Sequence, residues 1–544
     1  MSDHFNSLFS HDNGVVPPTN LAPVPGLSHI TFTASLVRRV IGKLKQKSAG
    51  GPDGVPPIFL KKCCSTLSEP LAFVYQLCFN NSYLPPAWLQ ANITPIFKKG
   101  DSTQPGNYRP ISLTCSLCKV MECVIKDQLI SYLASKNLIS KHQHAFLTRR
   151  STVTNLLECM HDWTISLQNR LNVDVVYIDF SHAFDGVVHN KLLQKLNSFG
   201  IHGLTLMWIA EFLSNRTQRV VLEHCFSAWS PVLSGIAQGS ILGPILFILF
   251  IDDVAAVCSG EVSHQLFADD LKLYSSIVSD LDAASIQASL DGLQQWCAIW
   301  QLDVNVAKCY ILHLGKTFSP HTYFFAGSAI PVANTVVDLG VTVDPLLNFD
   351  AHINSKISKA RSRVGALFKG FCTRSLPFLK KAFITYVRPM LEYASSVWNP
   401  YLLKHIDGIE RVQRQFTKRI YSLRDLPYAE RLAALDMEPL ELRRLKADLV
   451  LYYKVLNNLV HIPREYLPSE PTAHTIDTRS GVARLSVPHF TTNNNDNNFF
   501  NRCVSCWNSL PDRVVNSQSV ASFKHNVSTV DLRCFMHGNF LTSF

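Results

Sequence analysis

Two adjacent carboxylates, Asp269 and Asp270, stand inside the otherwise apolar and aromatic stretch HQLFADDLKLY, residues 264–274. An unpaired buried carboxylate is costly, and two like charges side by side raise each other's pKa, so a cation or a shared proton is expected near them. A hairpin turn through Ala268 and the two acids would instead expose them to water. The stretch alone leaves both interpretations open.

A third acid, Asp179, ends a strongly apolar run in DVVYIDFSHAFD, with Phe184 and Asp185 a few residues later. An Asp at a strand end also serves as a helix cap, here for a segment that begins near Ser181. If the strand that carries Asp179 lies beside the hairpin, however, three carboxylates converge on one spot. Such a cluster suits two Mg²⁺ ions about 4 Å apart, and the natural chemistry is phosphoryl transfer to an attacking 3′-hydroxyl.

Strand and helix patterns alternate around these acids. Short β-rich runs occur at residues 174–180, 218–224, 264–267, 271–278 and 309–315, and helical spacing occurs at 117–134, 152–168, 189–199, 204–214 and 282–300. Strands interleaved with helices predict an α/β domain. From about residue 351 to 460 strand signals nearly vanish, and Leu, Arg and Lys recur at helical spacing, which predicts a helical unit.

The positive charge is concentrated in that helical segment. The chain carries a net charge of +10, and residues 351–460 hold 20 Lys and Arg against 9 Asp and Glu, a net of +11. A solvated charged face is the alternative for any such segment. A local surplus of this size nevertheless favours a polyanionic partner, above all nucleic acid.

Signals for secretion, membrane insertion and disulfides are weak. The N-terminus lacks the basic stretch and apolar core of a secretory signal, and the longest apolar run, residues 241–251, is too short to span a bilayer and is expected to be a buried helix. The 15 Cys, an odd number, indicate reduced intracellular thiols. The CxxC pairs Cys115/Cys118 and Cys503/Cys506 lack a second ligand pair at zinc spacing, so we expect structural thiols.

The order and spacing of four motifs resemble the palm of reverse transcriptases: YIDFSHAFD (177–185), GIAQGSILGP (235–244), FADD (267–270) and NVAK (305–308). The resemblance is greatest to the non-LTR (LINE-type, jockey-like) retrotransposon enzymes. Upstream, SAGGPDGVPP, residues 93–113 and residues 143–157 are similar to their finger segments. Downstream, residues 338–344, 386–400 and 409–420 are similar to their primer-grip and thumb side, and residues 500–515 to their tail.

This resemblance implies a polymerase right hand, an α+β fold whose fingers and palm combine an antiparallel sheet with packed helices. The expected divisions are a weakly ordered leader at 1–33, fingers and palm at 34–350, a helical basic thumb at 351–460, and a C-terminal helical region of uncertain fold at 461–544. The implied activity is RNA-directed DNA synthesis on an RNA template from a DNA primer or target. A catalytically silent relic that only binds nucleic acid is the alternative, and a maturase or telomerase-like enzyme is a third reading.

Roles follow residue by residue from the resemblance. Asp179 and Asp269 would hold two Mg²⁺ ions, with Mn²⁺ as an alternative, Asp270 would support them, and Lys308 would protonate the leaving pyrophosphate. Phe184 matches the steric gate against ribonucleotides, although as a lone residue it reads as core. The other expected nucleotide-binding residues are Lys98, Lys99, Arg109, Gln238 and Gly239, with a solvated charge as the alternative for each lysine. The expected nucleic-acid-binding residues are Arg411, Arg414, Lys418 and Arg419.

The sequence departs from the family pattern at several positions. Ala237 replaces the usual proline before Gln-Gly, LTRRST lacks a usual glycine, and Asp338 stands where a hydrophobic or tyrosine residue normally precedes Leu-Gly. Only about 33 residues precede the fingers, so an endonuclease domain is expected to be missing, as in a truncated element product or a partial gene model. We expect nuclear or cytoplasmic residence and, as a further partner, an RNA-binding protein encoded by the same element.

Overall fold

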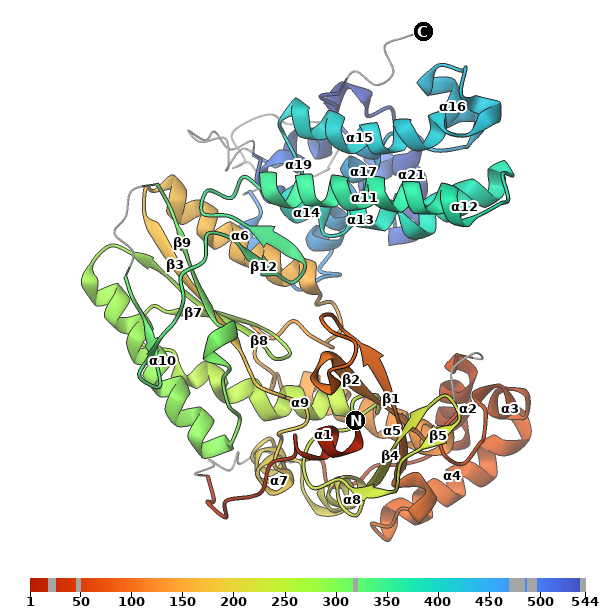
Figure 1. The fold of residues 1–544 in the computed structure, drawn as a ribbon, viewed down its shortest axis with the longest axis vertical. Helices are drawn as coiled ribbons and strands as arrows, with labels where there is room; N and C mark the ends of the chain where they lie inside the picture. The colour runs from red at the N-terminus through yellow and green to blue at the C-terminus, as the bar shows by residue number, and fades with distance from the viewer. Residues whose placement is uncertain (18–25, 46–49, 317–320, 469–484, 487–496, 539–544) are drawn as a thin grey trace.

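The computed structural model describes residues 1–17, 26–45, 50–316, 321–468, 485–486 and 497–538 (Figure 1). Two sheets with packed helices form the part of the chain up to residue 343, and helices form the part that follows (Figure 1). Among the described residues, no helix is long and apolar enough to cross a membrane.

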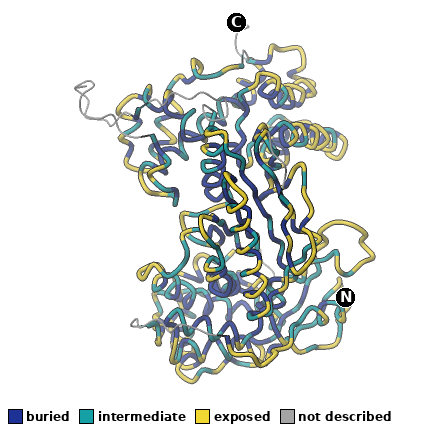
Figure 2. The backbone as a smooth tube through the Cα atoms, turned by 90° about the vertical axis from the view of Figure 1, so that its left-hand side faces the viewer, coloured by how far each residue is buried: buried dark blue, intermediate teal, exposed yellow. Residues whose placement is uncertain are grey.

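The three acids lie on a four-stranded antiparallel sheet with the order β7-β8-β3-β9. Its strands are β3 (Asn172–Asp179), β7 (Ser263–Phe267), β8 (Asp270–Ile277) and β9 (Tyr310–Leu314). Because successive side chains point to opposite faces of a strand, Val173 and Val175 enter one hydrophobic core while Val176 and Ile178 enter another. The sheet therefore separates two cores, and Figure 2 shows its strands as buried segments in the middle of the molecule.

A second, mixed sheet lies beside the first and has the order β2-β1-β4-β5, with β6 also paired to β4. Its strands are β1 (Gln90–Phe97), β2 (Tyr108–Thr114), β4 (Thr217–Leu222), β5 (Cys225–Phe226) and β6 (Ser230–Pro231). The β1–β2 pair is antiparallel, whereas β1 and β4 run parallel. The sequence patterns predicted β4 but neither β1 nor β2.

Helices cover both sheets and enclose the first core. They are α2 (Ala34–Lys43), α3 (Pro57–Lys62), α4 (Cys64–Asn80), α5 (Ser116–Ser135), α6 (Thr152–Gln168), α7 (His189–Ser198), α8 (Gly203–Leu213), α9 (Gly243–Ile251) and α10 (Asp280–Trp300). All five helical patterns predicted from the spacing are confirmed, and the apolar run at 241–251 includes the fully buried helix α9. Two ribbons follow, β10 (Phe324–Phe325) with β11 (Ser328–Ala329) and β12 (Val336–Asp338) with β13 (Val341–Val343).

The N-terminal 33 residues include helix α1 (Ser2–Asn6), whose Phe5 side chain is only 3% exposed. Phe5 packs against Ala91, Ile93 and Val220 of the mixed sheet. Residues 18–25 of this predicted leader lie outside the described residues. The described beginning of the chain is therefore packed onto the sheet.

Every element described between residues 350 and 456 is helical. The longer helices are α11 (Asp350–Gly370), α12 (Leu376–Tyr386), α15 (Leu403–Lys418) and α17 (Leu440–Leu456), and the shorter ones are α13 (Arg388–Glu392), α14 (Ser395–Trp398) and α16 (Tyr428–Ala434). Helices α19 (Phe499–Asn508) and α21 (Val520–Ser528) pack onto α17, and α20 (Asp512–Val515) packs onto α21. We call α11–α17 with α19–α21 the helical layer.

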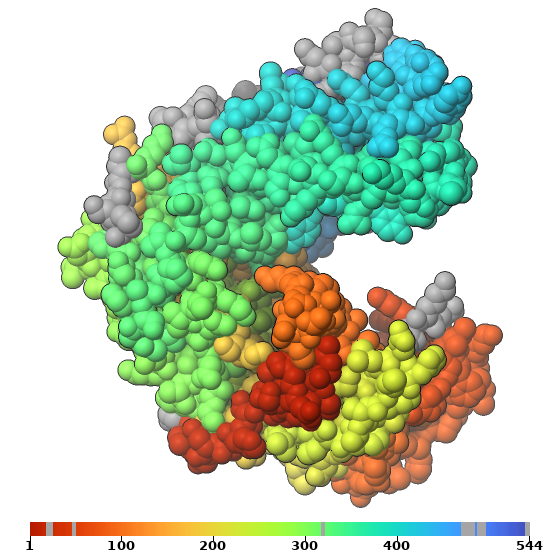
Figure 3. All heavy atoms as spheres, viewed as in Figure 1, coloured from red at the N-terminus to blue at the C-terminus, as the bar shows by residue number. Residues whose placement is uncertain are grey.

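A cleft separates the helical layer from the mixed sheet. Figure 3 shows the surface hollowed between α11 and α12 on one side and the β1–β2 and β4–β5 segments on the other. The β1–β2 loop, in orange, projects at the inner end of this hollow. The cleft thus leads toward the part of the molecule where the central sheet carries its acids.

Candidate active site

The carboxylate pair of FADD lies at a tight hairpin turn. Phe267 and Asp270 are paired at the ends of β7 and β8, so Ala268 and Asp269 are the two turn residues. Ala268 has a φ of +58°, a left-handed conformation that costs a residue with a Cβ about 1–2 kcal/mol. A strained turn at this place must be held by its surroundings.

Asp179 lies directly across from this turn. The register of β3 and β8 pairs Asp179 with Asp270, which puts their Cβ atoms about 5 Å apart on the same face of the sheet. Burial, followed by the neighbouring charge of Asp179, raises the pKa of Asp269. Burial and then the charge of Asp269 raise the pKa of Asp270 to about 6. The turn is present, and it leaves Asp270 exposed and Asp269 partly exposed while both stand beside Asp179.

Three cations surround the acids. The Lys308 Nζ lies 3.6 Å from Oδ2 of Asp179, in an open position where water weakens the ion pair. Burial, followed by the charges of Arg109 and Lys308, lowers the pKa of Lys98. Arg109 is exposed and opposite Ile96 across the β1–β2 pair. Mutually repelling cations beside carboxylates form a site for an anion.

The segment that carries Lys308 is tied to the central sheet by backbone hydrogen bonds. The Asn305 N–H donates to the Asp179 carbonyl at 2.8 Å, and the Lys308 N–H donates to the Asn305 carbonyl at 2.9 Å. Lys99 is exposed next to Lys98, and no contact of its side chain with the acids is found in the described part of the chain.

A partly buried carboxylate that the residue predictions omitted, Asp185, accepts hydrogen bonds from Gln238. The Gln238 Nε2 donates to both oxygens of Asp185 at 3.0 and 2.9 Å. Burial raises the pKa of Asp185 to about 6, against the opposing effects of Gln238 and Lys98. Asp185 therefore links the Gln238 side chain to the cationic cluster, and its place directly after Phe184 is the only signal for it in the sequence.

Gly239 and Phe184 have clear structural reasons for their identity. Gly239 has a φ of +130°, and a Cβ there would lie 2.5 Å from the Ser112 carbonyl oxygen on β2. The backbone that the glycine allows to come close is therefore that of the neighbouring strand β2. The Phe184 ring stacks on Phe247, with 4.3 Å between ring centroids, and remains partly exposed.

The donor set at the acids suits Mg²⁺, which prefers oxygen ligands and usually takes one or two carboxylates with water and substrate phosphates completing its shell. Burial, and after it the charge of a neighbouring carboxylate, raises the pKa of Asp269 and of Asp270, and a bound cation would favour their ionised forms. In the described residues, no three His, Cys, Asp or Glu side chains already form a set of ligands for one ion. The arrangement therefore fits an ion that a substrate helps to bind better than a preformed protein cage.

The four basic residues predicted to contact nucleic acid are all exposed on or just after helix α15. Lys418 and Arg419 line a groove with Arg361 of α11, and the Arg419 guanidinium lies over the Phe368 ring at 4.4 Å. The Arg414 guanidinium lies over Tyr428, 5.0 Å from the ring centroid. Helix α11 lies between α15 and the cleft (Figure 1), so this basic surface spans both helices.

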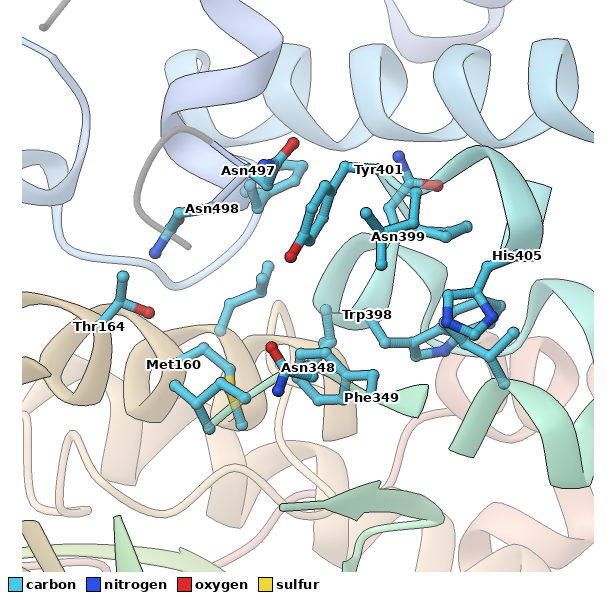
Figure 4. A pocket seen from close by; sticks show the side chains of 17 residues that line it. Met160, Thr164, Asn348, Phe349, Trp398, Asn399, Tyr401, His405, Asn497 and Asn498 are labelled. Carbon is cyan, nitrogen blue, oxygen red and sulfur yellow. The ribbon is translucent and has the colours of Figure 1, made fainter. Parts of the chain in front are cut away.

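A separate pocket lies where α6 meets the helical layer (Figure 4). Met160 and Thr164 of α6 face Trp398, Asn399 and Tyr401 across it. None of the predicted site residues lines this pocket. It marks the junction between the central sheet and the helices, away from the acids.

Comparison with known proteins agrees with this geometry. Residues 96–343 match the family model described as "Reverse transcriptase (RNA-dependent DNA polymerase)". The chain is 28% identical over 400 residues to "RNA-directed DNA polymerase from mobile element jockey" of Drosophila melanogaster, which covers 71% of this chain and 44% of that protein. It is 27% identical over 413 residues to "Probable RNA-directed DNA polymerase from transposon BS" of Drosophila melanogaster, with the same coverage of 71% and 44%. The chain thus spans less than half the length of these curated relatives.

Proposed function

We propose, from the premise that residues 96–343 are a reverse transcriptase domain, that this chain adds deoxynucleotides to a DNA 3′-hydroxyl on an RNA template. The observation that carries the proposal is the pairing of Asp179 with Asp270 beside the Asp269 turn, with cations facing them. RNA template, DNA primer and dNTPs are the proposed substrates.

In this proposal, Asp179 and Asp269 hold two Mg²⁺ ions, with Mn²⁺ as a substitute, and Asp270 supports them. Such ions, when bound, lower the pKa of the attacking hydroxyl and stabilise charge on the phosphates. Lys98 and Arg109 bind the triphosphate, because their charges face the acids from the β1–β2 pair. Lys308, beside Asp179, gives its proton to the leaving pyrophosphate. Gln238, held by Asp185, orients toward the nucleotide.

The overall arrangement is proposed to be a right hand, with fingers and palm within 34–350 and a thumb within 351–460. The cleft in Figure 3 would hold the template–primer duplex. Arg411, Arg414, Lys418 and Arg419 would contact nucleic acid that extends beyond the cleft, on the basic surface that α15 shares with α11. Because phosphate contacts release counterions, affinity should fall steeply with salt.

Primer extension tests the proposal directly. On poly(rA)/oligo(dT) with dTTP and Mg²⁺, the chain is expected to extend the primer, and omission of Mg²⁺ should stop extension. Salt-sensitive binding of the hybrid without any extension would overturn the proposal and support the silent relic instead.

Substitution of Phe184 by Val is expected to increase use of ribonucleotides relative to deoxynucleotides by about tenfold or more, the scale of one lost steric contact in a pocket. The stacked Phe247 ring fixes the Phe184 ring, so a smaller side chain opens space beneath the sugar. Single-nucleotide incorporation of rUTP and dTTP measures the ratio, with Phe184→Tyr as the control that keeps the ring. An unchanged ratio in the Val variant would exclude the gate role.

Mg²⁺ is expected to raise the thermal unfolding midpoint near pH 7.5 but not near pH 5. The pKa of Asp270 is raised to about 6 from 3.8, so its contribution to stability is complete below about pH 4 and lost as pH rises through about 6. Mg²⁺ can offset this loss only where the carboxylates are ionised. Thermal melts of the protein and of the Asp269→Asn/Asp270→Asn variant measure the effect, and an equal Mg²⁺ shift in that variant would place the ion elsewhere.

A further inference from the structure

The hairpin turn that carries Asp269 is held by one buried side chain from a distant part of the chain, Gln143. This residue is 0% exposed and lies in the loop before α6. Its Oε1 accepts hydrogen bonds from the Ala268 N–H and from the Ala145 N–H, each at 3.0 Å. The first of these bonds reaches the turn residue next to Asp269.

The backbone around Gln143 extends the same contact along β7. The Leu266 N–H donates to the His142 carbonyl at 3.0 Å, and the His144 N–H donates to the Leu266 carbonyl at 2.9 Å. These bonds make a parallel bridge between Gln143 and Leu266 at the edge of the central sheet. The loop thus fixes Gln143 relative to β7 before its side chain meets the turn.

The chemistry of the side chain matters because the contact needs an acceptor. The two groups that meet Oε1 are both backbone donors, and Nε2 of Gln143 has no hydrogen-bond partner among the described atoms. The amide is therefore oriented entirely by its oxygen. Ala268, the residue it holds, has the left-handed φ that a residue with a Cβ seldom adopts.

We infer that Gln143 is a positioning residue that holds the Ala268–Asp269 turn so that the Asp269 carboxylate faces Asp179. This inference rests on the proposed function for its effect on catalysis, but not for its effect on the turn. Gln143 touches no reacting atom. It acts through the backbone of Ala268.

Gln143→Leu removes the acceptor while keeping most of the buried volume. It is expected to lower kcat for nucleotide addition about 100-fold, as a misplacement of about 1 Å does, with the Kd for template–primer changed less than about twofold. Gln143→Glu keeps an acceptor oxygen and is expected to recover most of kcat.

Gln76→Leu is the matched control. Gln76 lies on helix α4, far from the turn in the sequence. Its side-chain oxygen also accepts a hydrogen bond from a backbone N–H, that of Phe32, at 2.9 Å. This control should leave kcat within about twofold of the parent even if it lowers the unfolding midpoint as much as Gln143→Leu. Equal losses of kcat in both variants would assign Gln143 a general role in stability and overturn the inference.

A variant that relieves the backbone strain at Ala268 tests whether Gln143 acts through the turn or through the rest of the fold. Ala268→Gly allows the positive φ without a Cβ, so Gln143→Leu should cost at least about threefold less kcat in that background. Equal fold-losses in the two backgrounds would contradict action through the turn.

Hydrogen exchange provides a measurement that does not depend on activity. In Gln143→Leu, amides of a peptide spanning residues 263–277 should exchange at least about tenfold faster than in the parent and in Gln76→Leu. Unchanged exchange there would overturn the inference, whether or not the protein synthesises DNA. An inactive parent with accelerated exchange in the variant would instead reject the proposed function and keep the positioning role.

Discussion

Asp269→Asn is expected to reduce nucleotide incorporation by about 10³-fold or more, the scale of removing a directly acting electrostatic group, while binding of an RNA–DNA hybrid stays nearly unchanged. Asp269 stands at the tip of the β7–β8 turn beside Asp179, where, in the proposed function, its oxygen atoms would hold an ion and would not contact a phosphate of the duplex. Asparagine has almost the same shape, but it offers a metal ion one neutral amide oxygen in place of two carboxylate oxygens. Primer extension and fluorescence anisotropy of a labelled hybrid measure the two properties.

The same variant is expected to lose activity without losing stability. Burial raises the pKa of Asp269, so at pH 7 its ionised form opposes folding, and neutral Asn should leave the metal-free protein as stable or more stable. Asp291→Asn, an exposed acid on α10, is the control and should change neither property. A parallel loss of hybrid binding and incorporation in Asp269→Asn would show that the residue supports the fold or the duplex instead of the ions.

Asp338→Leu is expected to lower the free energy of unfolding by about 3–5 kcal/mol, because it leaves a buried cation without its partner. The Lys272 Nζ lies 2.6 Å from Oδ2 of Asp338, and both side chains are only 5% exposed. Burial alone would lower the pKa of Lys272, but the charges of Asp338 and Cys159 and the hydrogen bonds to them together outweigh burial and raise this pKa. Denaturant unfolding followed by circular dichroism measures the change.

A compensating variant separates the ion pair from simple loss of packing. Lys272→Met combined with Asp338→Leu replaces the pair by apolar groups and should recover most of the stability lost in Asp338→Leu. If the double variant is as unstable as the single one, the pair does not explain the effect. The control Lys380→Met removes a pair with an Asp436 side chain that is 99% exposed and should change stability by less than about 1 kcal/mol.

This ion pair also explains a departure from the family pattern. Asp338 occupies a place where a hydrophobic or tyrosine residue is usual, and its partner Lys272 lies on β8, two residues after Asp270. The charge of Asp338 contributes to the raised pKa of Asp270, while Lys272 opposes it. The negative charge of Asp338, which the usual residue at this place would not carry, is therefore neutralised by Lys272.

The sequence predicted those strands and helices whose own residues show a clear apolar pattern. The alternation and apolar character of residues 174–180 and 271–278 identified β3 and β8, and five amphipathic patterns identified helices. Strands β1 and β2 pair with each other, but each contains a proline, Pro95 and Pro110, which weakens a strand pattern in the sequence, and β1 also pairs with β4 more than a hundred residues away. The meeting of Asp179 with the Asp270 strand was a hypothesis from the two acidic strand ends, which the family resemblance supported, and the register of the sheet bears it out.

Positioning contacts were harder to predict than the acids themselves. Gln143 and Ala268 are 125 residues apart, and nothing in the composition of QHAFLTRRST marks the glutamine as a support for a turn. Asp185 follows Phe184 in the sequence, but its role depends on where the Gln238 loop folds back. Such contacts exist only once the tertiary structure has formed.

The second hydrophobic core joins the central sheet to the helical layer, with Val173, Val175 and Leu312 of the sheet and Leu391, Val412 and Phe416 of the helices in one cluster. The matched family region ends at residue 343, inside the chain segments that build this core. A fragment cut at that boundary would keep α6 against this face of the sheet but would expose the part of the core that the later helices cover. A shortened version of this chain therefore has to retain the helices, since the distance between the acids and the opposite wall of the cleft is maintained by shared side-chain packing and not by a linker.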